Sequence, residues 1–435
     1  MPYQADSKVT VKGGTLMNEV EKQVLQAIDF EGMLEYLCDL IAVRSLVGDE
    51  TAGQEHVAAQ MERCGLEVDL WELDFDELSQ HPAFSIEEER ERGLGVVGVV
   101  GEDAGGRSLI LNGHVDVVPA GDEDLWHYPP WQGTIAEGRM YGRGAVDMKG
   151  GLCCALFAAK AVQDAGVRLK GRLILESVIG EEDGGVGTLA TVLRGYTADG
   201  AIVVEPTELA VAPAQAGAFN FRVTIPGKAA HGCVREEGVS PIEKFIPIHE
   251  ALMSLERERN ERHQDPLYAR YKLPNALCIG TIRAGTWASS VAESLVFEGR
   301  YGIAVDEDQE AARCALEEVV AEAAQADPWL RDHPPVVEWW GGQFYPARTP
   351  VEHPLVQTIA GALGNVTGAT ADLEGMTYGA DMGLLVNVGH TPTVLFGPGD
   401  VRVSHRPDEY VAVRELELAA RTLALTALRF CGYNA

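Results

Sequence analysis

The chain has 435 residues, 46% of them hydrophobic and 23% charged, which is an ordinary globular balance and enough length for two domains or for one domain with a large insertion. Its 66 acidic and 35 basic residues give a formal net charge of -31, which argues against nucleic acid or an anionic membrane as a partner because such a field repels phosphate. The eight cysteines form no Cys-x-x-Cys pair and no apolar run approaches the roughly 20 residues of a membrane span, so we expect a cytoplasmic protein with reduced thiols and no transmembrane segment.

Residues 1–18 are polar and lack the apolar core of a signal peptide, and we expect them to form a flexible, poorly ordered tail. From residue 19 to residue 40 apolar side chains recur with helical spacing, a pattern typical of an amphipathic helix that covers one face of a sheet. A second such helix is expected over residues 53–64. The next apolar runs predict strands at 68–73 and 95–100.

Further along, apolar strands alternate with helices. A nearly all-apolar segment after Asp147 predicts a buried helix, and strands are expected at 109–111, 172–179, 201–204 and 392–396. Such alternation is typical of an α/β domain in which a mostly parallel sheet carries helices on both faces. We assign residues 19–215 and 334–435 to this domain.

Between these two parts the pattern changes. Apolar and polar residues alternate over 219–225, as in a strand with one wet face. Amphipathic helices follow at 241–261 and 308–324, and two more strands lie between them, at 277–282 and 295–303. Residues 216–333 are therefore predicted to form an inserted two-helix α+β domain.

Histidine and acidic side chains follow the ends of the predicted strands. Because ligands of parallel sheets bind beyond the carboxyl ends of the strands, we expect these side chains to converge: His114, Asp147, Glu181, Glu182, Glu205 and His405. Nitrogen and oxygen donors without thiolate suit zinc, cobalt or manganese in a catalytic site better than a structural zinc. Of two adjacent glutamates, one can bind metal while its neighbour moves a proton. Asp116, two residues after His114 in extended backbone, can lie beside that imidazole and orient it.

Five motifs in this order carry a family resemblance. They are His114-x-Asp116-x-Val-Pro, the segment from Tyr141 to Gly151, Glu181-Glu182, Glu205-Pro206-Thr207 and His405-Arg406-Pro407-Asp408-Glu409. Together they resemble the dinuclear zinc hydrolase family of acetylornithine deacetylase, succinyl-diaminopimelate desuccinylase, aminoacylase and carboxypeptidase G. The resemblance covers nearly the whole chain past the tail, and it implies a zinc-exopeptidase-like catalytic domain with an inserted lid and dimerisation domain.

The resemblance also implies a role for each residue at the strand ends. Asp147 would bridge two divalent ions, which we expect to be Zn²⁺, with Co²⁺ or Mn²⁺ as alternatives, and its peptide bond to Met148 would be cis. The remaining implied ligands are Glu182 and His405 for one ion and His114 and Glu205 for the other. Glu181 would be the general base and acid, and Asp116 would orient His114.

Two residues of the inserted domain match positions that act on substrate in the family. His231, in the segment from Gly227 to Gly232, matches a histidine that stabilises the oxyanion, often across a dimer interface. Arg300 matches an arginine that helps to hold substrate. The resemblance therefore implies a homodimer formed through the inserted domain.

One departure from the family bears on the substrate. Many relatives place an arginine for the substrate carboxylate where this chain has Gly383. An arginine fork to a carboxylate is strong and geometrically specific. Either the substrate lacks that carboxylate, or Arg300 or Arg402 binds it.

Several functions are compatible with these residues. The first is a zinc-dependent amidohydrolase that removes an acyl group from an N-acylated amino acid or related amine, with Glu181 as base and acid. A deformylase of an N-formyl aminopyrimidine, or of another amide without an α-carboxylate, is favoured by Gly383. A dipeptidase or carboxypeptidase is a further alternative, and so is a non-catalytic binding protein on the same fold, against which the retained Glu181 speaks.

Overall fold

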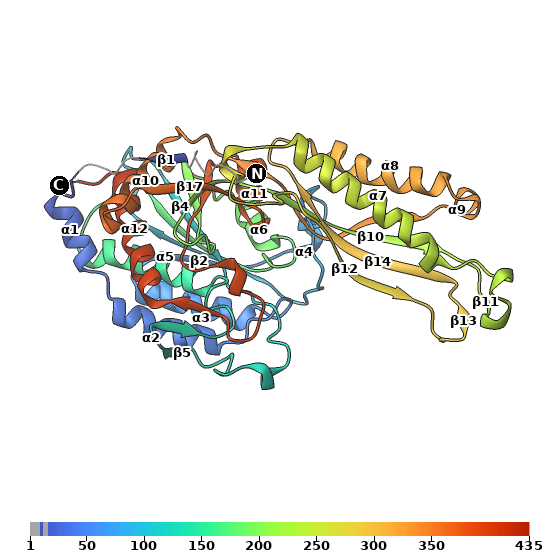
Figure 1. The fold of residues 1–435 in the computed structure, drawn as a ribbon. Coiled ribbons are helices and arrows are strands. Elements are labelled where there is room, and N and C mark those ends of the chain that lie inside the picture. Colours follow the sequence, from blue (N-terminus) through green and yellow to red (C-terminus); the bar gives the residue numbers. More distant parts are fainter. Residues whose placement is uncertain (1–8, 12–15, 435) are drawn as a thin grey trace. The chain divides into compact units, whose positions relative to one another are not determined.

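The computed structural model describes residues 9–11 and 16–434, and these divide into two units (Figure 1). The first unit holds the described residues up to Gln215, Ala347–Met376 and those from Ala380 onward; the second holds Ala216–Pro346 and Thr377–Gly379. The predicted insertion begins where the second unit begins, but its predicted end at residue 333 is too early. Residues up to Pro346 join the second unit because they include a strand of its sheet.

The first unit is built on one large sheet. From edge to edge its strands are β1 (Val9–Val11), β17 (Ala371–Met376), β9 (Val211–Gln215), β18 (Thr393–Leu395), β8 (Gly200–Val203), β4 (Leu109–His114), β7 (Leu173–Val178), β3 (Leu94–Val100) and β2 (Glu67–Glu72), and β16 (Ala347–Arg348) pairs with β9. The four adjacent strands β18, β8, β4 and β7 are parallel, which confirms the predicted parallel sheet at its centre. Antiparallel pairs occur toward both edges.

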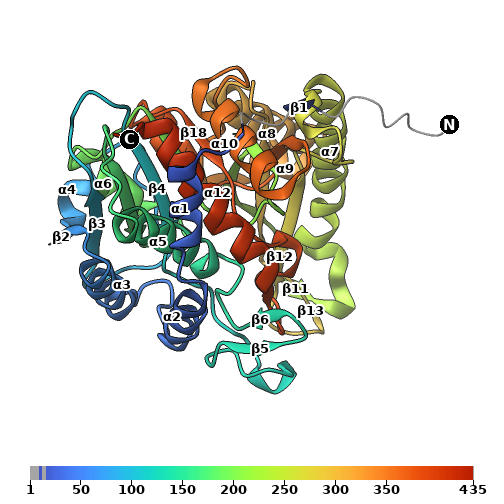
Figure 2. The ribbon, with the colours of Figure 1, turned by 90° about the vertical axis from the view of Figure 1, so that its left-hand side faces the viewer.

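Helices cover both faces of this sheet, as predicted (Figure 2). On β7, Ser177 donates to Gln54 of α3 (Thr51–Arg63), whereas Asn112 of β4 donates both to Glu176 and to Thr188 of α6 (Val186–Leu193). Since neighbouring residues of a strand point to opposite faces, α3 and α6 lie on opposite sides. The buried helix predicted after Asp147 is α5 (Lys149–Asp164), which packs against β4 and against α12 (Val413–Cys431).

Two expectations for the N-terminal part are wrong. Residues 9–11, placed in a flexible tail, form β1 and pair antiparallel with β17, while residues 1–8 and 12–15 lie outside the described part of the chain. The long helix expected from residue 19 to residue 40 is two helices, α1 (Glu19–Gln26) and α2 (Phe30–Ala42). The break has a local cause: the Asp29 carboxylate accepts a hydrogen bond from the amide of Gly32 and so starts a new helix.

The first unit has further helices and a second, smaller sheet. They are α4 (Phe75–Leu78), α10 (Pro354–Thr367), α11 (Met382–Asn387), the 3-10 turns η1 (Glu123–Leu125) and η4 (Val401–Val403), and a small sheet of β5 (Thr134–Ala136), β6 (Arg139–Tyr141) and β19 (Tyr410–Ala412). β19 pairs with β6 through Tyr410 and Tyr141. This pairing ties the segment after His405 to the segment before Asp147.

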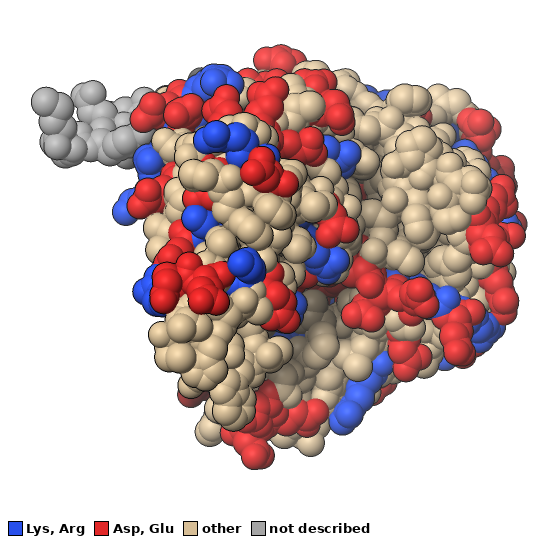
Figure 3. Space-filling view, turned by 90° about the vertical axis from the view of Figure 1, so that its right-hand side faces the viewer, with Lys and Arg blue, Asp and Glu red and all other residues tan. Residues whose placement is uncertain are grey.

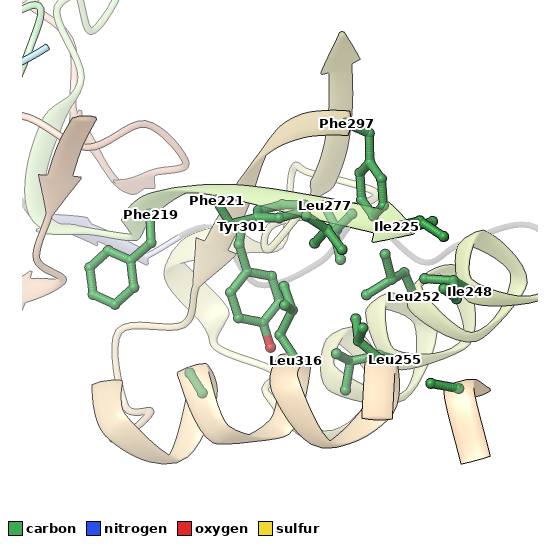
Figure 4. Packing of buried hydrophobic residues seen from close by; sticks show 14 of the residues in the cluster. Phe219, Phe221, Ile225, Ile248, Leu252, Leu255, Leu277, Phe297, Tyr301 and Leu316 are labelled. Atoms are coloured by element: carbon green, nitrogen blue, oxygen red, sulfur yellow. The ribbon is translucent and has the colours of Figure 1, made fainter. Parts of the chain in front are cut away.

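The second unit is an antiparallel sheet with helices packed on one face. Its strand order is β12 (Leu277–Ala284), β14 (Ser294–Ile303), β10 (Gly217–Pro226) and β15 (Val336–Phe344), its helices are α7 (Pro241–Arg262), α8 (Gln309–Gln325) and α9 (Pro328–Asp332), and it also contains η2 (Gly232–Glu237), η3 (Pro266–Tyr268) and the pair β11 (Ala230–His231) and β13 (Ser290–Val291). Alternate residues of β10, among them Phe221 and Ile225, are fully buried, and Figure 4 shows them beside Leu252 of α7. Alternation along β10 therefore builds this core.

Acidic side chains are spread over the surface, in keeping with the net charge. Figure 3 shows them on one face of the molecule with lysine and arginine side chains between them. None of the helices in residues 16–434 combines the length and hydrophobicity that a membrane span requires.

Candidate metal centre and active site

The predicted ligands are brought to one edge of the central sheet by neighbouring strands. His114 is the last residue of β4, Glu205 follows β8 by two residues, and Glu181 follows β7 by three. Asp147 lies in the turn before α5, and its peptide bond to Met148 is cis, as the resemblance implied. His405 follows η4 and has a left-handed backbone conformation, with φ 60°. Parallel strands thus deliver these side chains to the edge where α/β proteins bind ligands.

The side chains form two groups of potential metal ligands that share Asp147. One group is His114, Asp147 and Glu205, the other is Asp147, Glu182 and His405, and within each group the ligand atoms lie within 4.8 Å of one another. The two carboxylate oxygens of Asp147 face different histidines: Oδ1 is 3.3 Å from Nε2 of His114, and Oδ2 is 3.3 Å from Nε2 of His405. Asp147 is therefore placed to bridge two cations.

The surroundings of the fully buried His114 ring fit a cation. Its Nδ1 is 2.9 Å from the main-chain oxygen of Asp116, and because a carbonyl only accepts, Nδ1 carries the proton. Nε2 has no hydrogen-bond partner among the described residues, and three carboxylates surround it at 3.3, 3.7 and 3.8 Å, those of Asp147, Glu205 and Glu181. A nitrogen lone pair aimed into buried carboxylates is the arrangement that a divalent ion completes.

Asp116 contacts His114 in a different way from the one expected. Its carboxylate Oδ1 is 3.6 Å from Nδ1 of His114, too far for a hydrogen bond, and the main-chain carbonyl of Asp116 orients the ring instead. The carboxylate Oδ2 accepts a hydrogen bond of 3.1 Å from the amide of Glu182. The chain turns directly after β4, which points the carbonyl at the ring and the carboxylate at the next strand end.

Burial and like charges shift the pKa values of the acids. Burial, followed by the charge of Glu205, raises the pKa of Glu181 well above its usual range, and burial and Asp147 do the same to Glu205. Although burial opposes it, the nearby imidazoles of His114 and His405 lower the pKa of Asp147. In turn Asp147 and Glu182 outweigh burial and raise the pKa of His405 to about 11. Carboxylates crowded in this way favour a bound cation.

Glu181 differs from the other acids because it belongs to neither ligand group. Its side chain is 8% exposed, and its Oε2 lies 3.8 Å from Nε2 of His114. A carboxyl group with a raised pKa beside a metal site, but outside the ligand set, has the chemistry of a proton carrier.

The structure adds residues that the sequence analysis did not assign. The Oε1 atom of Glu409 accepts from the amides of Val146 at 3.2 Å and Asp147 at 3.4 Å, and Oε2 forms a buried ion pair with Arg143. Glu409 thereby holds the turn that carries Asp147. It stands in the last of the five motifs, but the motif gives no sign that this glutamate is buried.

Asp381 is a second buried acid near the site. Its Oδ2 accepts a 2.7 Å hydrogen bond from the Thr188 hydroxyl, and burial raises its pKa to about 7. A Cβ atom on Gly185, which has φ +83°, would come within 2.5 Å of its Oδ1, so the acid packs directly against the Gly184-Gly185 turn. In the sequence, the one indication that Asp381 belongs to the site was its position two residues before Gly383.

His231 and Arg300 lie in the second unit, whereas the ligand groups lie in the first. His231 is exposed at the end of β11, and its Nδ1 accepts from the amide of Cys233 at 3.1 Å, so Nε2 carries the ring proton of the neutral form. Arg300 is half-buried on β14 and donates from Nη2 to the carbonyl of Thr377 at 2.7 Å. The substrate roles of His231 and Arg300 stay predictions.

Comparison with curated proteins finds two deformylases. The chain is 29% identical to the N-formyl-4-amino-5-aminomethyl-2-methylpyrimidine deformylase of Halalkalibacterium halodurans, over 87% of this chain and 88% of that protein. It is 32% identical to the protein of the same name from Bacillus subtilis, over 71% and 76% of the two chains.

A solved structure of similar fold and a family match point to the same group of enzymes. The fold is similar to a dinuclear metal binding peptidase of the M20 family from Bacillus subtilis, with a TM-score of 0.60 and 15% identity over 92% of this chain and 98% of that one. Residues 110–429 match the family described as Peptidase family M20/M25/M40. The matched residues include all five motifs, and the family resemblance based on these motifs is confirmed. The chain therefore belongs to Peptidase family M20/M25/M40 and is a metallohydrolase of that family.

Proposed function

We propose that the chain hydrolyses the linear amide bond of a small N-acylated amine with the help of two divalent metal ions, and that an N-formyl aminopyrimidine is its substrate. One observation carries the reaction type: two ligand groups share Asp147, while Glu181 is buried next to them and outside both. This arrangement separates metal binding from proton transfer.

The donor set favours zinc. Two histidine nitrogens and carboxylate oxygens without sulfur suit Zn²⁺, with Co²⁺ and Mn²⁺ as alternatives. The similar fold of a dinuclear metal binding peptidase supports two ions. When bound, such ions would polarise the amide carbonyl and lower the pKa of a water molecule to about 7.

The residues of the chain supply the proton transfers. Glu181 takes a proton from the attacking water and delivers it to the leaving amine, a role that its raised pKa supports. His231 is proposed to donate from Nε2 to the carbonyl oxygen as that atom becomes negative, because its Nδ1 is already engaged within its own turn. Arg300 remains a proposed substrate contact.

Two observations favour an amide without an α-carboxylate. Gly383 lies buried in the first turn of α11 and supplies no cation. The arginines considered as substitutes are engaged elsewhere: Arg402 pairs with Asp400 at 2.7 Å and Glu208 at 3.2 Å, and Arg300 donates to Thr377. The similarity to two pyrimidine deformylases supports the same substrate class. We therefore place the formyl amide ahead of the N-acylated amino acid that the sequence analysis placed first.

A substrate panel tests this choice. With the zinc-loaded protein, kcat/KM for N-formyl-4-amino-5-aminomethyl-2-methylpyrimidine is expected to exceed that for N-acetylated amino acids by about 100-fold, because a site without a carboxylate-binding arginine gains nothing from that group. The N-acetyl analogue of the same pyrimidine is the matched control for acyl size. A preference for N-acetyl amino acids or for dipeptides would reject the formyl assignment and leave the amide hydrolase.

The second unit is proposed to join two copies of the chain. On α7, Ile242 and Ile246 are 51% and 54% exposed and lie one turn apart on the same side, and Ile282 on the edge strand β12 is 50% exposed. Exposed apolar side chains beside an open strand edge are typical of a protein–protein interface.

Light scattering tests the proposed homodimer. Ile246→Glu places a charge in the apolar face and is expected to raise the dimer Kd about 10-fold or more. Ile135→Glu, on β5 of the first unit with an isoleucine 50% exposed, is the control and should leave the mass unchanged. A wild-type chain that is monomeric at micromolar concentration contradicts the proposal.

A further inference from the structure

Outside the two ligand groups, the first unit contains a buried trio of charges: Glu50, Arg90 and Asp183. The side chains of Arg90 and Glu50 are completely buried, and that of Asp183 is 3% exposed. Nη2 of Arg90 lies 2.8 Å from Glu50 Oε1 and 2.8 Å from Asp183 Oδ1, and Nη1 lies 3.0 Å from Asp183 Oδ2. The guanidinium therefore joins a carboxylate at the start of α3 to one in the turn after β7.

The geometry requires a planar fork and not merely a positive charge. Nε of Arg90 donates to Glu50 at 3.0 Å, and Nη1 donates to the carbonyl of Glu88 at 3.0 Å. Asp183 Oδ2 also accepts from the amides of Glu87 and Glu88, at 3.2 and 3.0 Å. A lysine ammonium retains the charge but cannot make the two-sided set of bonds.

The trio borders the turn that carries the two catalytic-site glutamates. Asp183 directly follows Glu182, and within this turn the amide of Gly184 donates to the carbonyl of Glu181 at 3.1 Å. A Cβ atom on Gly180, which has φ +66°, would lie 2.8 Å from Nη2 of Arg90, so the guanidinium packs directly on the backbone before Glu181.

Gly184 is a second glycine at which this turn closely approaches the segment that carries Arg90. A Cβ atom on Gly184, with φ +141°, would come within 2.2 Å of the carbonyl oxygen of Ser85. The segment from Ser85 to Arg90 thus supports one side of the turn, and Asp116 holds the other side through the amide of Glu182.

We propose that Arg90 is a positioning residue for proton transfer: through Asp183 it fixes the Glu181-Glu182 turn so that Glu182 reaches His405 while Glu181 stays outside the ligand set. This inference rests on the proposed function. A purely structural ion pair would support folding equally well, so the test needs a readout that responds to the position of Glu181.

The sensitivity of kcat to the leaving group is such a readout. Arg90→Lys and Asp183→Asn are compared with the wild type on two formamides, one of an alkylamine and one of 4-nitroaniline. An alkylamine leaves only with a proton from Glu181, whereas nitroaniline leaves more readily. Both variants are expected to lower kcat about 30-fold for the alkylamine formamide and only about threefold for the nitroanilide, with the metal content unchanged.

Asp183→Asn guards against misfolding, since it removes the charge that ties Arg90 to the turn while the pair of Arg90 with Glu50 remains. Arg92→Lys is the matched control, because Arg92 is 49% exposed, pairs with Glu72 at the surface and should leave both rates unchanged. Equal losses of kcat on the two formamides, or no loss in either folded variant, overturn the positioning role while the proposed function stands. A wild-type chain that hydrolyses no formamide overturns both.

Discussion

Glu181→Gln is expected to lower kcat on the N-formyl pyrimidine about 1,000-fold, with KM and metal content close to wild type. The amide keeps the shape of the side chain but neither accepts the proton of the attacking water nor delivers one to the amine. Because Glu181 belongs to neither ligand group, both ions should remain bound. Steady-state kinetics on protein of measured metal content checks this prediction.

Glu176→Gln is the matched control for that change. Glu176 is another fully buried glutamate, on β7, and burial raises its pKa to about 8. Its Oε2 accepts a hydrogen bond of 3.0 Å from Asn112, and glutamine preserves this bond. Its substitution should leave kcat close to wild type. Turnover in Glu181→Gln equal to that of the control would remove Glu181 from the mechanism.

Asp147→Ala is expected to remove both metal ions and to lower activity below detection. Each oxygen of Asp147 faces a different histidine, so its loss deprives both ligand groups of their shared carboxylate and leaves His114 without its closest acid. Elemental analysis after dialysis should find about two ions per wild-type chain and close to none in the variant.

Glu205→Ala distinguishes a shared ligand from an ordinary one. Glu205 belongs only to the group with His114, so its loss should release one ion and keep the ion held by Glu182 and His405. An Asp147→Ala protein that still binds two ions would contradict the bridging role.

A chelator-treated wild type should melt at a lower temperature than the loaded protein, because the buried carboxylates then repel one another.

The local pattern of the sequence was sufficient to predict these strands and the polar residues that follow them. Apolar runs ending in His114 and Glu205 predict both a buried strand and a polar side chain at its end, because burial and strand period are local properties. The same holds for β10, whose alternation predicts its buried face. The assignment of ligands to particular ions came from the family resemblance and not from these patterns.

Other features depended on contacts between distant segments. β15 is part of the second unit because it pairs with β10, and no periodicity within residues 334–346 reveals that partner. Likewise the carboxylate of Asp116 is drawn away from His114 by an amide that belongs to the turn after β7.

Composition, periodicity and motif order by themselves determined the class of fold, the presence and start of the inserted unit, and the set of acids and histidines at the strand ends. The family resemblance implied the shared Asp147 and the separate Glu181, whereas only the tertiary structure decided the distances between these side chains and the support that Arg90 gives to the turn of Glu181. The reason is physical: a strand's period and burial are encoded in neighbouring residues, whereas the distance between two side chains depends on which strands are adjacent in the sheet.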